Sequence, residues 1–335
     1  MSLEITEAVE EIKFPKETHR EFAQDVSQGL TAEQKYLPSK YLYNKQGDQI
    51  FQEIMAMPEY YLTRSEYEIF SSQKSEILEK FSEGAEEFQL IEFGAGDGMK
   101  TKVLLQHFVA QQANFHYIPI DISANILSEL TSELQRHLPA LEVQAISDDY
   151  FSAIEQLNHT YKGGIRKVVL FLGANIGNFS AEEVKKFLHK VSEHISPGDR
   201  LMIGFDLKKD PTTILNAYFD KGGITKRFDL NLLHRINEEL DADFDLQSFQ
   251  YFPMYDPMEG VVRSYLVSQQ AQEVHIKALD ITVHFEAWEA IYMEQSRKFS
   301  LQNIDQLAQA TGFQVVHNFF DSKRYFTDSV WELKT

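Results

Sequence analysis

The chain has 335 residues, of which 43% are hydrophobic, so it can bury one or two cores and is not globally disordered. Its 51 acidic residues outnumber 32 basic ones, and the net charge of −19 opposes binding to nucleic acids or to anionic membranes. Because it has no cysteine, and its eleven histidines lack metal-binding spacing, we expect neither disulfides nor a metal site.

The sequence also shows no sign of export or membrane insertion. The first residues are acidic and lack the basic segment and apolar stretch of a secretory signal. No run of the sequence approaches the ~18 apolar residues of a membrane span. We therefore expect a cytoplasmic protein, a monomer or weak dimer, whose partner is a small molecule. Residues 1–19 are predicted to be loosely ordered.

The elements predicted before residue 82 are helices. Apolar residues three or four positions apart indicate helices from Glu21, over residues 48–57 and over residues 66–81. A turn-rich segment with clustered tyrosines, residues 37–47, precedes the second helix, and residues 58–64 interrupt the chain before the third.

From residue 88 onward the predicted strands and helices alternate. The strands are residues 88–93, 115–122, 141–146, 167–172 and 201–205. Helices follow over residues 101–111, after a cap at Ser123 and after a capping box at Ser180. This alternation predicts an α/β fold with a doubly wound, mostly parallel sheet, in which ligands bind at the carboxyl ends of the strands.

The alternation stops after residue 208. The later elements are a helix starting at Asp210-Pro211, a helix over 230–240, antiparallel strands within 246–268 and 272–287, a helix over 301–311 and a closing strand pair over 313–320 and 329–333. We infer a cofactor-binding domain of residues 73–208 plus 299–335. We assign residues 20–72 plus 209–298 to a second, α+β lobe, which we expect to bind the substrate.

One stretch carries the strongest functional signal. Residues 92–101, Glu-Phe-Gly-Ala-Gly-Asp-Gly-Met-Lys-Thr, lead from a buried strand through three alternate glycines into a helix. Glycines let the chain turn sharply and bring bare backbone against a ligand, and the following helix directs its first amides there. The pattern therefore predicts a loop for a nucleotide-type cofactor.

The spacing of the glycines distinguishes this loop from other kinds of nucleotide-binding loop. A P-loop needs a second glycine where Met99 stands, and a dinucleotide fingerprint needs its third glycine one residue later. The pattern that is left, an acidic residue followed by three alternate glycines, resembles the first motif of S-adenosylmethionine (SAM)-dependent methyltransferases. The alternative is a glycine-rich turn that binds no ligand. On this resemblance the loop residues that bind the cofactor are Glu92, Gly94, Ala95, Gly96 and Lys100.

Two further strand ends are predicted to complete the cofactor site. Asp121 ends the second strand, where it can bond both ribose hydroxyls or, alternatively, only turn the chain before Ser123. Asp149 and Tyr150 follow the third strand, where the adenine edge would lie. An equally supported interpretation is that they only form a charged helix cap. After the fourth strand, residues 171–179 (Phe-Leu-Gly-Ala-Asn-Ile-Gly-Asn-Phe) are predicted to form a substrate loop.

These segments together resemble the family of SAM-dependent histidine Nα-methyltransferases of ergothioneine biosynthesis, which also includes a fungal tryptophan-derivative N-methyltransferase. The resemblance implies a Rossmann-like methyltransferase sheet with a second substrate lobe. The matching stretches, in the family's order, are residues 41–47, 58–64, 92–101, 171–178, 206–210, 217–220, 228–231, 237–240 and 296–299.

The resemblance implies roles for individual residues. Asn178 and Tyr218 match the pair that holds the α-carboxylate and amine, and Gly173 lines the same place. Tyr43 and Tyr60 match tyrosines around the amine and the side-chain pocket. Tyr43 and Asn178 would align the amine for attack on the methyl group, so they are the predicted catalytic residues.

Acceptor specificity is implied to depend on the strands after residue 260. Glu294 and Ser296 match the pair that reads an imidazole ring. Ser264 stands where the histidine enzymes carry a pocket-lining methionine, and Arg263 reverses the charge of its neighbour there. We therefore expect N-methylation of an amino-acid α-amine, with L-histidine the first candidate. A different amine, or a SAM-binding protein without catalysis, are the alternatives.

Overall fold

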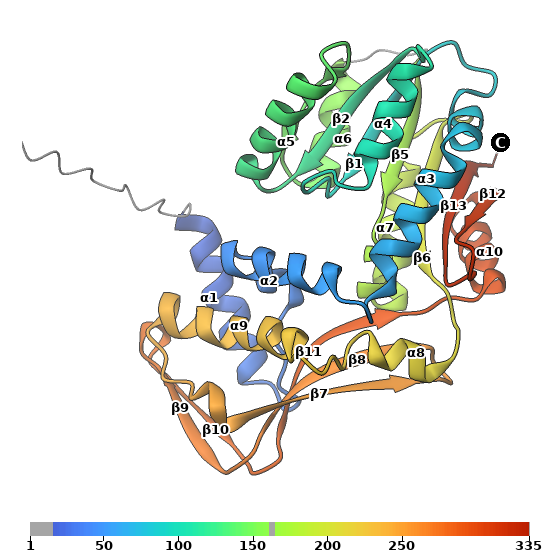
Figure 1. Ribbon diagram of the computed structural model, residues 1–335. Coiled ribbons are helices and arrows are strands. Elements are labelled where there is room, and N and C mark those ends of the chain that lie inside the picture. The colour runs from blue at the N-terminus through green and yellow to red at the C-terminus, as the bar shows by residue number, and fades with distance from the viewer. Residues whose placement is uncertain (1–15, 161–164, 335) are drawn as a thin grey trace, which may run out of the picture. The chain divides into compact units, whose positions relative to one another are not determined.

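The computed structural model describes residues 16–160 and 165–334. The chain divides into two compact units. Unit 1 comprises Met1–Glu53, Lys221–Pro253 and Arg263–Glu294, and unit 2 comprises Ile54–Asp220, Met254–Val262 and Gln295–Thr335. The elements are labelled in Figure 1.

Unit 2 contains an eight-stranded, mostly parallel sheet (Figure 1). The strands are β1 (Phe88–Phe93), β2 (Phe115–Asp121), β3 (Glu142–Val143), β4 (Ile146–Ser147), β5 (Arg166–Phe171), β6 (Arg200–Asp206), β12 (Phe313–Phe320) and β13 (Phe326–Leu333). Their order is β12-β13-β6-β5-β1-β2-β3, with β4 also paired to β2. β13 runs antiparallel to β6 and to β12, whereas the other pairs are parallel. The predicted α/β class and the closing antiparallel pair are confirmed.

Helices cover both faces of this sheet. Phe88 and Leu90 of β1 face one apolar cluster, and Ile91 and Phe93 face the other, as strand alternation requires. The first cluster takes side chains from α3 (Tyr61–Ser82), α4 (Thr101–Ala110) and α5 (Ala124–His137). The second takes them from α6 (Tyr150–Thr160), α7 (Ala181–Ser192) and α10 (Leu301–Ala310). The sheet is therefore doubly wound.

The order of the strands locates the ligand side of the sheet. β1 pairs with β2 on one side and with β5 on the other, so the chain order reverses around β1. Loops leaving the carboxyl ends of strands diverge at such a point and leave room for a ligand. The glycine loop leaves β1 at this position.

Three sequence-based boundaries differ from the structure. The strand expected over residues 141–146 is two short pieces, because Pro119 of β2 has no N–H to donate between the pairs formed by Tyr117 and Ile120. Helix α6 and strand β11 (Ala290–Arg297) were not predicted. Residues 54–72, which the sequence analysis assigned to the substrate lobe, lie in unit 2, because α3 packs its buried Ile69 and Phe70 into the first cluster.

Unit 1 contains helices and antiparallel strands. They include α1 (Lys16–Leu30), most of α2 (Lys45–Ala56), α9 (Ile224–Leu240), and the hairpin of β9 (Gln272–Ile276) and β10 (Ile281–Phe285). The chain passes between units within β7 (Phe249–Asp256), β8 (Val261–Ser268) and β11, which form a sheet in the order β11-β8-β7. Of the N-terminus predicted to be loose, residues 1–15 lie outside the described chain, and residues 16–19 form the first turn of α1.

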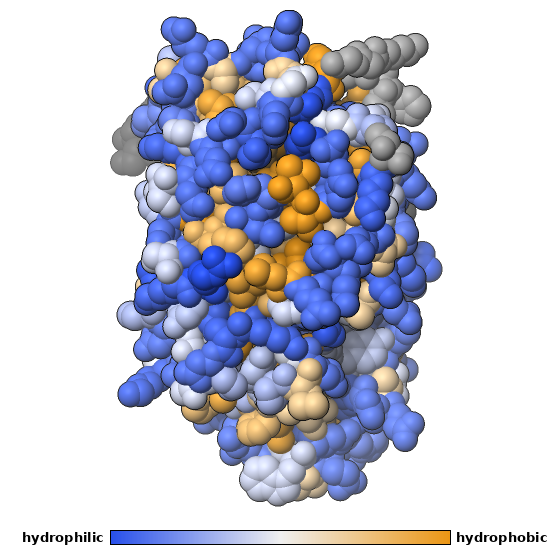
Figure 2. Space-filling model, turned by 90° about the vertical axis from the view of Figure 1, so that its right-hand side faces the viewer, coloured by the Kyte–Doolittle hydropathy of each residue, from blue (hydrophilic) through white to orange (hydrophobic). Residues whose placement is uncertain are grey.

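One face of the protein combines hydrophilic and hydrophobic regions. Figure 2 shows a face covered mainly by hydrophilic side chains, with a strip of hydrophobic ones through its middle. Within the two described ranges, none of the helices combines the length and apolar character needed to cross a bilayer.

Candidate active site

The three alternate glycines after β1 all adopt left-handed backbone conformations. Their φ angles are +67° at Gly94, +54° at Gly96 and +64° at Gly98, a region that residues with a side chain rarely enter. A Cβ at Gly98 would lie 2.7 Å from Leu130 Cδ1, so this glycine lets α5 pack against the loop. A Cβ at Gly96 would meet no atom within 4 Å. Gly96 therefore presents bare backbone to open space, as a cofactor site requires.

Hydrogen bonds hold the glycine loop against the end of β2. The N–H groups of Gly94 and Ala95 donate to the Ile120 carbonyl at 2.9 and 3.2 Å. The Gly96 N–H donates to Asp121 Oδ2 at 3.1 Å. The loop and the predicted ribose-binding carboxylate are thus brought together at the ends of two adjacent parallel strands.

Asp121 also turns the chain into α5. Its Oδ1 accepts from the Ser123 N–H at 2.9 Å, and Ser123 caps the helix as predicted. The next residue, Ile122, is 79% exposed although it is large and apolar. An exposed apolar side chain beside the predicted ribose-binding carboxylate is suited to contact the face of a nucleoside base. The sequence analysis did not single out Ile122.

Glu92 lies behind the loop and not on its open side. It is buried, its Oε1 accepts from Thr101 Oγ1 at 2.6 Å, and its Oε2 accepts from the Tyr117 hydroxyl at 2.5 Å. Both oxygens are therefore used inside the protein, where they join β1, β2 and the start of α4. These bonds make Glu92 a positioning residue for the loop, and its contact with the cofactor stays a prediction.

The burial of Glu92 predicts a pH-dependent stability. Burial raises its pKa from 4.5 to about 7, although the two hydroxyl donors oppose the shift. Between these pH values the unfolded chain releases the proton while the folded protein keeps it, so stability falls as pH rises, by roughly 3 kcal/mol in total. Urea unfolding from pH 4.5 to 7.5 should show this fall for the wild type relative to Glu92→Gln, which cannot titrate. Parallel stability profiles of the two proteins would contradict the assignment.

The other two predicted cofactor residues lie after β4. Tyr150 stacks on Phe93 with ring centroids 4.9 Å apart, and its hydroxyl lies 3.0 Å from where a Gly94 Cβ would be. Asp149 accepts from the N–H groups of Phe151 and Ser152 at 3.0 and 3.1 Å, and these bonds, with that from the Ser152 hydroxyl, lower its pKa. Tyr150 is therefore close to the loop, whereas the Asp149 carboxylate caps α6.

Lys100 is linked to the substrate loop through Glu66 of α3. The Lys100 ammonium pairs with Glu66 Oε2, and Glu66 Oε1 accepts from the Gly173 N–H at 2.8 Å. Although burial opposes it, the charge of Glu66 raises the pKa of Lys100. Burial and Glu66 both raise the pKa of the neighbouring, fully buried Asp328. Glu66 is thus a positioning residue for two predicted site residues, and the sequence analysis missed it.

The open position of Gly96 predicts a selective loss of SAM binding. In Gly96→Ala the new Cβ enters the open space and strains a left-handed residue, so we expect the SAM Kd to rise at least about tenfold. Gly198→Ala is the matched control, because Gly198 has φ +94° and also no atom within 4 Å of its Cβ position. Calorimetry should give that control the wild-type SAM Kd. An equal Kd in Gly96→Ala would contradict the cofactor assignment.

The predicted substrate loop leaves β5 through two left-handed residues. The φ angles are +74° at Gly173 and +58° at Ala174, and a short 3-10 turn, η2 (Asn175–Asn178), follows. Asn178 is half-buried, and among the described residues its side chain has no hydrogen-bond partner. A half-buried amide with unused donors and acceptors is suited to bind a ligand.

Tyr218 and Ser296 meet at a buried ammonium group. The Tyr218 hydroxyl donates to Ser296 Oγ at 2.9 Å, and Lys298 donates to both, at 2.6 and 2.8 Å respectively. Lys298 also pairs with Asp206 at 2.8 Å, and both side chains are fully buried. Although burial raises it, Lys298 and Lys209 keep the pKa of Asp206 below its usual value. Lys298 therefore fixes the positions of two predicted substrate residues.

The tyrosines at the start of α3 adjoin this cluster. Tyr60 has its ring edge-on to Tyr218, with centroids 6.4 Å apart. The Tyr61 hydroxyl donates to Asp206 Oδ2 at 2.8 Å. Lys298, Asp206 and Tyr61 were not predicted as site residues, although all three lie within or beside segments that carry the family resemblance. Burial of an ion pair at the end of β6 cannot be read from the sequence.

Three predicted acceptor residues lie in unit 1. Tyr43 packs edge-on to Phe51 and Phe228 at centroid distances of 5.5 and 5.4 Å and is 40% exposed. Ser264 is buried in β8 and Glu294 is half-buried in β11. Ser264 and Glu294 both lie near the buried Asp229 of α9, another residue that the sequence analysis did not single out.

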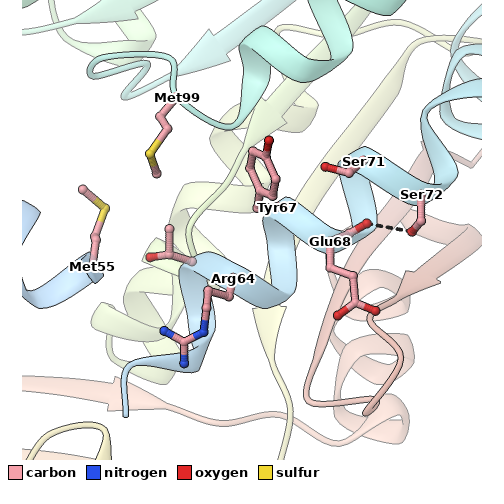
Figure 3. A pocket seen from close by; sticks show the side chains of 8 residues that line it. Met55, Arg64, Tyr67, Glu68, Ser71, Ser72 and Met99 are labelled. Atoms are coloured by element: carbon pink, nitrogen blue, oxygen red, sulfur yellow. Dashed lines mark hydrogen bonds between the residues drawn. The ribbon is translucent and has the colours of Figure 1, made fainter. Parts of the chain in front are cut away.

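A pocket of about 740 Å³ lies beside α3 in unit 2. Met55 and Met99 point toward each other across it, and Tyr67 extends from the helix (Figure 3). Its lining residues are Met55, Thr63, Arg64, Tyr67, Glu68, Ser71, Ser72 and Met99. Met99 belongs to the glycine loop, between Gly98 and Lys100, so this pocket adjoins the predicted cofactor loop, although none of the predicted cofactor or substrate residues lines it.

Comparison with known proteins places the chain in a family. The family described as histidine-specific methyltransferase, SAM-dependent, matches residues 22–333. The chain belongs to this family. Histidine N-alpha-methyltransferases of Mycobacterium tuberculosis and Mycolicibacterium smegmatis are 34% and 35% identical to it. The matches cover 92% and 89% of this chain and 92% and 90% of those proteins.

Among solved structures, a SAM-dependent methyltransferase from Clostridium acetobutylicum matches 88% of this chain and 99% of its own. The sequence identity is 12% and the TM-score is 0.41.

Membership of the histidine-specific methyltransferase family establishes an enzyme whose cofactor is SAM. The site fits this cofactor, because Gly96 leaves space against the backbone and Asp121 stands at the adjacent strand end. The assignments of individual site residues remain predictions.

Proposed function

We propose that this protein transfers the methyl group of SAM to the α-amine of L-histidine. The observation that supports this most is the combination of a SAM loop at Gly96 with a polar acceptor cluster at Tyr218, Ser296 and Lys298 in the same unit. The mycobacterial relatives named for this activity match nearly the whole chain. We further propose that it acts on a small molecule in the cytoplasm, as a monomer or weak dimer.

The chain's own residues have to orient the amine and keep it neutral. SAM supplies an activated methyl group on a sulfonium, so the protein chiefly contributes positioning. Asn178 and Tyr218 are proposed to hold the α-carboxylate and direct the amine. Tyr43 and Asn178 are proposed to align its lone pair, with the proton passing to water. Tyrosine faces can also stabilise the resulting ammonium.

A second candidate is methylation of a different amine, such as an aromatic amino acid or modified metabolite. Ser264 favours it, because a buried hydroxyl in β8 stands where the family resemblance implies an apolar, pocket-lining methionine. The alternative of a SAM-binding protein without catalysis is set aside, because the chain belongs to a family of methyltransferases.

Calorimetry separates these readings. Titrations with histidine, with tryptophan and with SAM alone are made on the wild-type protein, the amino acids in the presence of S-adenosylhomocysteine. We expect histidine to bind and tryptophan to bind much more weakly. Binding of tryptophan but not histidine would favour the second candidate, and binding of SAM without either amino acid would contradict the assignment of histidine as the acceptor.

A further inference from the structure

The buried carboxylate of Glu66 contacts both of the loops that leave the sheet at the predicted active site. Its side chain is 1% exposed, and its Oε2 pairs with the ammonium of Lys100, the residue that ends the glycine loop. Its Oε1 accepts from the N–H of Gly173 at 2.8 Å, at the start of the predicted substrate loop. Each oxygen therefore accepts from a different loop, one predicted to bind SAM and one predicted to bind the acceptor.

The two loops also approach each other directly. The Lys100 Nζ lies 3.3 Å from the position that a Cβ on Gly173 would take. Lys100 thus extends from the cofactor loop to the backbone of the substrate loop, and Glu66 holds the end of its side chain there. All three residues belong to unit 2, so these contacts lie within one compact unit.

The sheet beneath Glu66 supplies a second carboxyl group. Helix α3 packs against β6 and β13 (Figure 1), and a Cβ at Gly204 of β6 would lie only 2.6 Å from Glu66 Oε1. The Glu66 carboxylate therefore occupies the space that a side chain at Gly204 would need. Asp328 of β13 is the antiparallel partner of Gly204. Such partners direct their Cβ atoms to the same face, about 5 Å apart, so the buried Asp328 lies beside Glu66.

The positions of the donors decide which of the two carboxyl groups carries a proton. Burial and the charge of Glu66 raise the pKa of Asp328, and the two groups share a hydrogen bond, which requires a proton on one of them. No N–H or hydroxyl group of the described residues donates to Asp328. Both Glu66 oxygens already accept, from Lys100 and from Gly173. The proton therefore belongs to Asp328, which donates it to an ionised Glu66.

We propose that Glu66, kept ionised by a protonated Asp328, is a positioning residue that holds the cofactor loop and the substrate loop at the separation that methyl transfer requires. In-line transfer needs the methyl carbon and the attacking nitrogen aligned at about 3–3.5 Å, and a displacement of about 1 Å can cost a hundredfold in rate. The inference rests on the proposed function only for the identity of the acceptor.

The test measures kcat for Glu66→Gln with saturating SAM and histidine. The substitution removes the charge that holds Lys100 and turns an N–H group toward one of the two donors, so we expect kcat to fall about 10- to 100-fold. Calorimetry should still find about one SAM bound per chain, because the site is displaced and not unfolded. Glu79→Gln, which changes an exposed glutamate of the same helix, is the matched control and should behave as wild type.

A second variant, Asp328→Asn, tests the placement of the proton. An asparagine keeps a neutral hydrogen-bond donor beside Glu66, so kcat should stay within about threefold of wild type. An equal fall of kcat in Asp328→Asn and Glu66→Gln overturns the inference, because any change in the buried cluster would then have the same effect. A kcat of Glu66→Gln within about threefold of wild type, or a loss of SAM-binding sites in proportion to kcat, also overturns it.

Failure of the proposed function has a different signature. If the wild type methylates another amine and not histidine, the same variants are measured with that amine, and only the proposed function falls. Should Glu66→Gln not fold, Gly204→Ala displaces the Glu66 carboxylate without removing its charge. We then expect kcat to fall about threefold or more, and an unchanged kcat with the same SAM stoichiometry overturns the inference.

Discussion

We expect Asn178→Ala to lower kcat/KM for the acceptor by about a hundredfold or more, while the SAM Kd changes less than twofold. The amide of Asn178 is half-buried at the end of the substrate loop and has no protein partner among the described residues. Its removal therefore takes away a ligand contact without breaking the fold. Steady-state kinetics and calorimetry with SAM measure the two quantities separately.

Asn175→Ala is the matched control for that substitution. Asn175 begins the same 3-10 turn but is exposed, so its loss should change kcat/KM less than about threefold. Equal losses in both variants would mean that the turn as a whole matters and not the Asn178 amide. Wild-type turnover in Asn178→Ala would remove Asn178 from the acceptor site.

The second large effect is expected from Lys298→Met. This substitution removes the ammonium that bonds Asp206, Tyr218 and Ser296 and leaves a buried carboxylate with fewer partners. Breaking one side of a buried ion pair costs about 3–5 kcal/mol of unfolding free energy. We also expect a higher KM for the acceptor, because two predicted acceptor residues lose their common anchor. Urea unfolding and steady-state kinetics measure these effects.

Two further variants separate stability from binding. Lys185→Met changes an exposed lysine of α7 and should alter the unfolding free energy by less than about 0.5 kcal/mol. Tyr218→Phe keeps Lys298 and Asp206 paired but removes one hydroxyl, so acceptor KM should rise while stability falls by only about 1 kcal/mol. A Lys298→Met protein as stable as wild type would contradict the role of the ion pair.

Features that depend on local chain geometry could be predicted from the sequence. Three alternate glycines implied three turns that a Cβ would hinder, and Gly94, Gly96 and Gly98 all have positive φ. The capping box at Ser180 and the cap at Asp210 with Pro211 in the first turn are confirmed for the same reason, because caps involve residues a few positions apart.

Features that depend on which residues become buried could not be predicted. Glu92 was expected at the cofactor, but Thr101 and Tyr117 draw both its oxygens inward. Glu66 and Asp229 were missed because an acidic residue in a helix is usually exposed. Strand β11 was missed, since the sequence there has no regular alternation, and its burial pattern is also irregular. Such positions are set by packing between distant segments.

The most direct test of the proposed function is mass spectrometry of L-histidine incubated with the wild-type protein and SAM. We predict a product heavier by one or more methyl groups, with fragmentation locating them on the α-nitrogen and not on the imidazole. The product should be absent without SAM and should form much more slowly with Asn178→Ala. If histidine gains no methyl group while the protein binds SAM, or if the methyl lies on the ring, the proposed function is wrong.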